Sequence, residues 1–275
     1  MQGCRRDVPV SVIVPCYRCS LTIERAISSI VLQVQKPAEV ILIDDASGDE
    51  TLNVIQALEK QYSGWIKVVS LFVNVGAASA RNSGWEIATQ PYIAFLDSDD
   101  AWHPRKLEIQ YAFMRDNPSV VLSGHGHRIL KGNNENLDWK VFLGKELYIQ
   151  KWQLLVSNRF VTPSVMVRRG IKQRFIEKQR YMEDHMLWLQ IIYSGATVVK
   201  LPIELAAIYK SPFGVAGLSS QLWLMEYGEL KNLANLYRER KINWGQLNAL
   251  RVFSLLKYTR RVIVYWGLMR WKKKK

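Results

Sequence analysis

The chain has 275 residues, of which 48% are apolar and 23% charged, and no stretch is of low complexity. This composition excludes a disordered or fibrous protein and suffices for one large core, or for a domain with an appendage. The net charge of +14 favours anionic partners such as nucleic acid, nucleotide phosphates or an anionic membrane. Lys and Arg concentrate at 168–180 and 251–275, so the excess charge belongs to the second half of the chain.

The three cysteines predict free thiols, because an odd number in a chain with a large core does not suggest a disulfide framework. Cys16 and Cys19 form a Cys-x-x-Cys between a strand pattern and a helix pattern, as in thioredoxin-like redox proteins. We favour plain thiols over a metal site there, because zinc would need more ligands. The apolar run at 8–15 is too short for a signal peptide, so we expect a cytoplasmic protein.

The first 125 residues alternate between strand and helix patterns. Strands are expected at 10–15, 38–43, 66–71, 91–96 and 120–123, and helices at 21–32, 51–62, 76–88 and 103–115. This alternation predicts an α/β fold of the Rossmann-like kind, with a mostly parallel sheet flanked by helices on both faces.

The pattern is less regular after about residue 125. We expect short helices or strands at 149–156, 161–167, 182–193, 197–201 and 204–209, and loops at 131–136 and 211–217. From Gln221 the pattern is helical to the end, with a soft break near 241–243. The sequence therefore predicts one domain over 1–215, with halves at 1–125 and 126–215, and a basic helical extension at 216–275.

Three carboxylates follow the fourth expected strand, namely Asp97, Asp99 and Asp100. They lie at the carboxyl end of that strand, where open α/β sheets bind ligands. In extended backbone, Asp97 and Asp99 would point to the same side and could hold one cation, whereas Asp100 would cap the following turn. Acidic triplets are also common in loops and helix caps, so the motif alone is weak evidence for a metal.

Residues after the first two strands reach the same edge of the sheet, namely Pro15, Tyr17, Asp44 and Asp45. The two acids could hydrogen-bond a base or a ribose, and Tyr17 could stack on the base. The alternative is that the acids cap the helix that begins at Thr51 and that Tyr17 packs in the core.

The first strand is not followed by the Gly-x-Gly-x-x-Gly that cradles a pyrophosphate in dinucleotide-binding folds. Another group must then neutralise the phosphates. A divalent cation on Asp97 and Asp99 would do so, because Mn²⁺ or Mg²⁺ binds a few carboxylate oxygens together with phosphate oxygens and water.

Four segments in combination resemble the inverting glycosyltransferases of family 2, which have the GT-A fold. The segments are 10–17, 42–51, 76–84 with its Arg-Asn pair, and 96–102 with its Asp-x-Asp-Asp-x-Trp. The pair Glu183-Asp184 extends the resemblance to about residue 200. The Asn that usually follows the tyrosine of the first segment is Arg18 here, which concerns the local turn.

The resemblance implies roles on the donor side. Pro15 and Tyr17 would line the nucleotide pocket, Asp45 and Arg81 would contact the uracil or other base, and Asp97 and Asp99 would hold the diphosphate through Mn²⁺ or Mg²⁺. Asp44 would lie beside them in the nucleotide site. The simpler interpretation of Arg81 is a solvated arginine on a helix surface.

On the acceptor side, the resemblance implies that Asp184 is the base and that Glu183 and Trp102 support it or contact the acceptor. Independently, a carboxylate at a helix N-terminus stays ionised, as a base requires. Ordinary capping carboxylates and a core tryptophan are the alternatives. The expected reaction moves a sugar from a nucleoside diphosphate, with UDP favoured, to a saccharide or polyprenyl-diphosphate-linked acceptor in surface polysaccharide synthesis. The halves 1–125 and 126–215 would then be the nucleotide-binding and acceptor halves of a catalytic domain.

The segment 250–271 mixes aromatic and aliphatic residues with Arg and Lys and contains no acid. A membrane-spanning helix needs about 20 consecutive apolar residues, and Arg260, Arg261 and Arg270 interrupt this run. Two interpretations stay open: a helix on the anionic inner face of the cell membrane, which would make the protein peripheral there, or a solvated basic tail on a core-packed helix.

Two other functions compete with the transferase. The net charge suggests a nucleic-acid-binding protein, but we expect no nucleic acid, because the basic residues lie away from the expected crevice. A phosphatase with an Asp-x-Asp nucleophile would carry its acids after the first strand, whereas here they follow the fourth. His125 and His127 could bind a metal, but a histidine pair with no third ligand nearby is more often structural.

Overall fold

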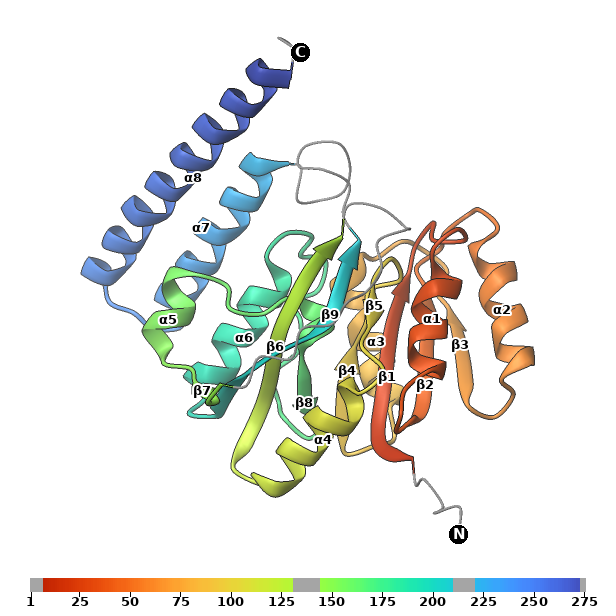
Figure 1. Ribbon diagram of the computed structural model, residues 1–275. Helices are drawn as coiled ribbons and strands as arrows, with labels where there is room; N and C mark the ends of the chain where they lie inside the picture. The colour runs from red at the N-terminus through yellow and green to blue at the C-terminus, as the bar shows by residue number, and fades with distance from the viewer. Residues whose placement is uncertain (1–6, 131–143, 210–220, 273–275) are drawn as a thin grey trace.

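The computed structural model describes residues 7–130, 144–209 and 221–272, with side chains described up to residue 266. Its strands are β1 Val8–Cys16, β2 Pro37–Asp44, β3 Ile66–Ser70, β4 Tyr92–Phe95, β5 Ala101–Trp102, β6 Val120–Leu130, β7 Leu147–Tyr148, β8 Met166–Arg168 and β9 Thr197–Tyr209. Its helices are α1 Ile23–Val31, α2 Thr51–Gln61, α3 Ala77–Ile87, α4 Lys106–Asp116, α5 Lys151–Val156, α6 Glu183–Tyr193, α7 Leu222–Arg238 and α8 Trp244–Lys272, with a 3₁₀ turn η1 at Thr162–Ser164. Figure 1 shows one sheet with helices on both faces and α7 and α8 at its far end.

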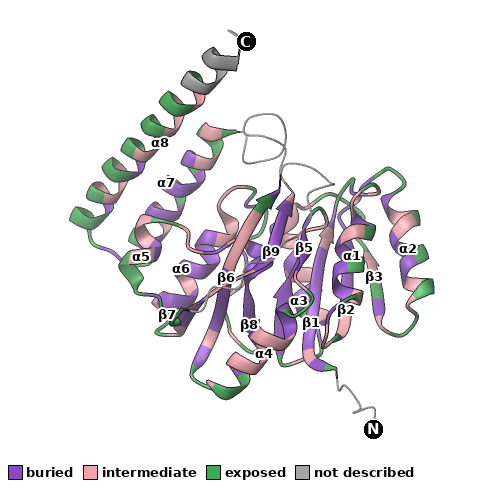
Figure 2. Cartoon of the chain, in the orientation of Figure 1, coloured by how far each residue is buried: buried purple, intermediate pink, exposed green. Residues whose placement is uncertain are grey.

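The first half of the sheet is parallel, in the order β3-β2-β1-β4, as the alternating pattern predicts. These strands are apolar on both faces, because helices cover both. Ile13 and Ile41 pack on the α3 and α6 side, whereas Val12 and Leu42 pack on the α1, α2 and α4 side. Figure 2 shows the resulting buried interior of the sheet.

The second half of the sheet is mixed, because β8 runs antiparallel to both β4 and β6. The strand expected at 161–167 is mostly the η1 turn followed by three residues of β8. The two strands expected at 197–201 and 204–209 form the single strand β9, which pairs in parallel with a longer β6. Pro202 has no backbone N–H to donate to the hydrogen bonds between β6 and β9, and the register of these two strands shifts near Pro202. The loops expected at 131–136 and 211–217 lie outside the described residues.

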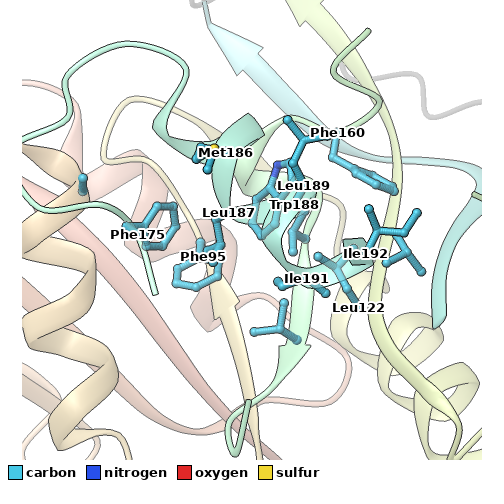
Figure 3. Packing of buried hydrophobic residues seen from close by; sticks show 14 of the residues in the cluster. Phe95, Leu122, Phe160, Phe175, Met186, Leu187, Trp188, Leu189, Ile191 and Ile192 are labelled. Carbon is cyan, nitrogen blue, oxygen red and sulfur yellow. The ribbon is translucent and has the colours of Figure 1, made fainter. Parts of the chain in front are cut away.

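Helix α6 crosses the core on the α3 side of the sheet. Its residues from His185 to Leu189 are all buried, as in a helix surrounded by other elements. Phe175 links it to the sheet, with ring centroids 5.4 Å from Phe95 and 6.2 Å from Trp188, and Figure 3 shows the aliphatic side chains that fill the space around them. This packing places the N-terminus of α6 next to the carboxyl end of β4.

The helical extension expected after Gln221 is confirmed as α7 and α8, with a break at 239–243. None of the described helices is long and apolar enough to span a membrane. The division of the chain into functional units at 125 and 215 stays a prediction.

Candidate active site

Tyr17 and Arg18 form a tight turn after β1. Tyr17 is 46% exposed, so the alternative interpretation that it packs in the core is wrong, whereas its contact with a base stays a prediction. Arg18 adopts a left-handed conformation with φ of 49°, donates its backbone N–H to the Ser47 hydroxyl at 3.2 Å, and places its guanidinium 5.4 Å from the Tyr17 ring. Asn tolerates that backbone conformation better than Arg. The Arg that replaces the usual Asn of the family motif therefore makes the backbone of this turn less favourable. Pro15 pairs with Ile43 inside the sheet.

Asp44 and Asp45 are both buried at the end of β2. Asp45 accepts the backbone N–H groups of Val75 at 2.7 Å and Gly76 at 2.8 Å, which fixes the segment before α3. Asp44 accepts hydrogen bonds from Ser47 and Ser70. The backbone N–H of Thr51 is held instead by Asp49 at 3.0 Å. The interpretation of the two acids as caps of α2 is therefore wrong, whereas their contact with a base stays a prediction.

The acidic motif is a turn rather than an extended segment, because the N–H of Asp100 donates to the Asp97 carbonyl at 3.0 Å. The prediction that Asp97 and Asp99 point to the same side assumed an extended backbone, and that assumption is wrong. Asp99 is exposed, whereas Asp100 is buried. An oxygen of the Asp100 side chain accepts the N–H of Tyr209 at 3.1 Å. Asp100 thus joins the motif to β9 and does more than cap a local turn.

Arg81 bridges the two halves of the site. Its guanidinium donates to Asp97 at 2.7 Å and to Glu183 at 3.1 Å, lies 5.3 Å from the Phe175 ring, and is 5% exposed. Burial alone would lower the pKa of Arg81, and the charges of Asp97 and Glu183 outweigh it and raise that pKa. The interpretation of Arg81 as a solvated helix arginine is wrong. Its contact with a base stays a prediction.

Glu183 and Asp184 open α6 in different environments. Burial and then the neighbouring charge of Asp184 raise the pKa of Glu183 to about 7, although Arg81 opposes the rise. Asp184 accepts the backbone N–H of His185 at 2.6 Å and the side-chain amide of Asn158 at 3.1 Å. The N–H contact is of the capping kind, whereas the amide contact comes from a distant segment and fixes the direction of the carboxylate. The base assignment stays a prediction.

Sequence reasoning missed Asn158 and Phe175, because both lie in irregular segments and their contacts join residues 26 or more positions apart. It also left Trp102 open. Trp102 is 2% exposed, donates its indole N–H to the Pro163 carbonyl at 2.8 Å, and lies 3.7 Å below the Lys106 ammonium. The core interpretation of Trp102 therefore holds, and any role toward an acceptor must act through its neighbours.

Among the described residues, neither the histidine pair nor the cysteine pair lies in a group of ligands large enough for a metal site. His125 is buried, and burial followed by the charge of Lys106 lowers its pKa to about 3. Cys16 and Cys19 are free thiols, as expected, and Cys4 lies outside the described residues. In the described parts of the chain, no three His, Cys, Asp or Glu side chains are grouped as a metal site would need.

The donor set of the acidic turn nevertheless fits a hard divalent cation. Asp97 and Asp99 offer carboxylate oxygens, and Mn²⁺ or Mg²⁺ commonly takes one or two carboxylates and completes its coordination with phosphate oxygens and water. Two acids suffice for such a site only when a diphosphate is present. The protein alone is therefore expected to bind the metal weakly.

Structural comparison shows that the chain has the GT-A fold. S. aureus TarS in complex with UDP-GlcNAc superposes with a TM-score of 0.66 and 19% identity, over 90% of this chain and 71% of that one. Mannosyltransferase PcManGT from Pyrobaculum calidifontis, with GDP-Man and Mn²⁺, gives a TM-score of 0.64 and 17% identity, over 95% and 76%. Identities this low establish the fold alone.

Sequence comparison gives the family. The profile of Glycosyl transferase family 2 matches residues 11–175. The UDP-Glc:alpha-D-GlcNAc-diphosphoundecaprenol beta-1,3-glucosyltransferase WfgD of Escherichia coli is 32% identical over 187 residues, which cover 68% of this chain and 70% of that protein. The chain therefore belongs to glycosyltransferase family 2, and it is a glycosyltransferase. The family expected from the four motifs is confirmed, and so is the choice of a transferase over a phosphatase.

Proposed function

We propose that the protein is a metal-dependent inverting transferase that moves a sugar from a UDP-sugar to a saccharide or polyprenyl-diphosphate-linked acceptor in bacterial surface polysaccharide synthesis. The observation that carries the proposal is the Arg81 bridge. It joins Asp97, at the end of the strand where the diphosphate would bind, to Glu183, which precedes the candidate base. Donor-side and acceptor-side groups thus share one rigid cluster.

The donor would lie across the carboxyl ends of β1, β2 and β4. Tyr17 offers an exposed ring for stacking on a base, Pro15 and Asp44 would lie beside the nucleotide, and Asp45 and Arg81 would supply polar contacts. UDP is favoured because TarS was solved with UDP-GlcNAc and WfgD is named for UDP-Glc. Mn²⁺ or Mg²⁺ on Asp97 and Asp99, when bound, supplies neutralisation of the leaving diphosphate.

The two acids at the start of α6, Glu183 and Asp184, would have different roles in the reaction. Asp184 is held in one direction by two hydrogen-bond donors, so it would be positioned to accept a proton from the acceptor hydroxyl. Glu183 is buried, and its pKa of about 7 leaves it partly protonated near neutral pH. The two adjacent carboxylates thus lie in different environments, which suits them to different roles in one site.

The acceptor and the place of reaction follow from the same proposal. WfgD is named for a diphosphoundecaprenol acceptor. Such an acceptor lies at a membrane, so we place the enzyme at the inner face of the cell membrane as a peripheral protein. Residues 1–125 would form the nucleotide-binding half, 126–215 the acceptor half, and 216–275 the part that approaches the lipid.

Thermal unfolding in the presence of UDP, GDP or dTDP, each with and without Mn²⁺, tests this function. We expect UDP with Mn²⁺ to raise the melting temperature of the wild type and to have little effect on Asp99→Ala, because the cation links the diphosphate to the protein. Asp116→Ala, which removes an exposed acid of α4, is the matched control and should respond like the wild type. If no nucleoside diphosphate stabilises the wild type, the proposal is wrong.

A further inference from the structure

Helices α7 and α8 pack against each other through charged and polar side chains. Glu226 and Glu229 of α7 are 0% and 6% exposed. Glu226 accepts hydrogen bonds from Ser254 at 2.6 Å and from Arg261 at 2.7 Å, and Glu229 accepts one from Lys257 at 2.6 Å. Positions 254, 257 and 261 follow helical spacing, so this half of α8 turns a polar stripe toward the protein.

The opposite side of α8 is mostly apolar, with Thr259 and Arg260 as its exposed polar residues, and faces away from the protein. Val252, Leu256, Ile263 and Trp266 are 59%, 64%, 66% and 62% exposed. Successive residues of an α-helix are rotated by about 100° around the helix axis. The four side chains therefore lie within about 80° of one another around that axis, on the side opposite the polar stripe. Phe253, Leu255 and Val264 widen the apolar surface on both sides and are also exposed. We call these seven residues the outer face of α8, and Figure 2 shows exposed residues along this helix.

This arrangement reverses the usual order of an amphipathic helix in water, which buries its apolar side and exposes its charges. Contiguous exposed apolar patches on proteins mark interaction sites. The aromatic surface continues onto α7, where Trp223 is 54% exposed and packs against Tyr258 with ring centroids 5.6 Å apart. Tryptophan and tyrosine favour the interface between water and a bilayer.

The charge of the segment identifies the partner. No acidic residue occurs from Arg240 to Lys275, and four lysines end the chain. Arg260 is exposed within the outer face, between Leu256 and Phe253 around the helix axis, and its long side chain could reach lipid phosphates. Two copies of α8 packed through this face would bring arginines together without acids to pair them, whereas an anionic bilayer supplies both the apolar phase and the counter-charge.

We propose that the outer face of α8 is a membrane-docking surface that inserts into an anionic lipid leaflet with the helix lying in its plane. The binding itself follows from α8 alone, whereas its purpose, to bring the active site to a lipid-linked acceptor, rests on the proposed function. Figure 1 shows α8 at the outer edge of the molecule, beyond α7. A flat leaflet could therefore meet α8 along its length.

Flotation of the full chain with vesicles tests the proposal. The wild type should float with vesicles that contain phosphatidylglycerol and bind those of phosphatidylcholine alone far less. The double variant Leu256→Glu with Ile263→Glu should lose roughly tenfold or more of its vesicle partitioning, because it places charges in the inserted face. Leu32→Glu is the control, because Leu32 is 68% exposed at the end of α1, away from α8, and this variant should bind like the wild type.

Three results would overturn the proposal. The first is a wild type that does not float, and the second is a double variant that floats as well as the wild type. The third is a wild type that is dimeric by light scattering without vesicles while the double variant is monomeric, because the outer face would then pack against a second copy. Stabilisation by UDP and Mn²⁺, measured on all three proteins, reports on the active site separately, so loss of docking and failure of the proposed enzyme function give different results.

Discussion

At the scale of single residues, Arg81 determines how the site is built. Sequence motifs predict that this arginine matters, but they do not reveal its partners, because the cluster joins α3, β4 and α6 across 102 positions of the chain. Two carboxylates and one guanidinium leave the cluster with a formal excess of negative charge when all three are ionised. The raised pKa of Glu183 reduces this excess near neutral pH.

Replacing Arg81 by Met is expected to destabilise the protein by about 3 kcal/mol or more, because removal of one partner leaves Asp97 and Glu183 as unpaired, partly buried acids. Arg81→Lys should recover part of the loss. Urea unfolding measures both. The control is Arg115→Met, which removes an arginine that is paired with Asp116 on the surface and should not change stability measurably. Equal effects of the two Met variants would contradict the bridge.

At the scale of elements, close contact between α3 and the sheet positions Arg81. Gly84 lies one helical turn after Arg81, and a Cβ added there would lie 2.6 Å from a methyl carbon of Ile13. The helix can approach β1 only because position 84 has no side chain. The four motifs predict this helix, whereas its distance from the sheet depends on a contact with the first strand.

Gly84→Ala should therefore destabilise the protein by about 1–3 kcal/mol, in spite of the higher helix propensity of alanine, because overpacking moves α3 away from β1. Gly170→Ala is the matched control, since a Cβ there meets no atom within 4 Å. Chemical denaturation should show a lower midpoint for Gly84→Ala only. If Gly84→Ala is as stable as the wild type, α3 does not depend on this contact.

The first four strands and helices follow from the sequence because each is set by local periodicity. The second half of the sheet does not. β8 has only three residues, and its antiparallel pairing is set by β4 and β6, which are far away in the chain. The polar side of α8 can be explained only by its contacts with Glu226 and Glu229 of α7. In the candidate site, the motifs predict which residues matter, whereas the turn at Asp97 and the support of Asp184 by Asn158 appear only in three dimensions.

At the scale of the whole molecule, three features lie along the chain in a functional order. A parallel sheet carries the candidate nucleotide-binding residues, α6 brings the candidate base to the same edge, and α8 presents an exposed outer face. Sugar transfer to a lipid-linked acceptor would use all three. Asp184 is the residue on which this account depends most, because chemistry at the acceptor hydroxyl is assigned to it alone.

The most direct test is the transfer of radiolabel from UDP-sugars to polyprenyl-diphosphate-linked saccharides in the presence of Mn²⁺. We expect the wild type to transfer label and Asp184→Asn to lose at least about 10²-fold in rate, because an amide cannot accept the proton. The same variant should keep its stabilisation by UDP, and Asp116→Asn should behave like the wild type. If Asp184→Asn transfers label at the wild-type rate, or if the wild type transfers none from any UDP-sugar, the account is contradicted.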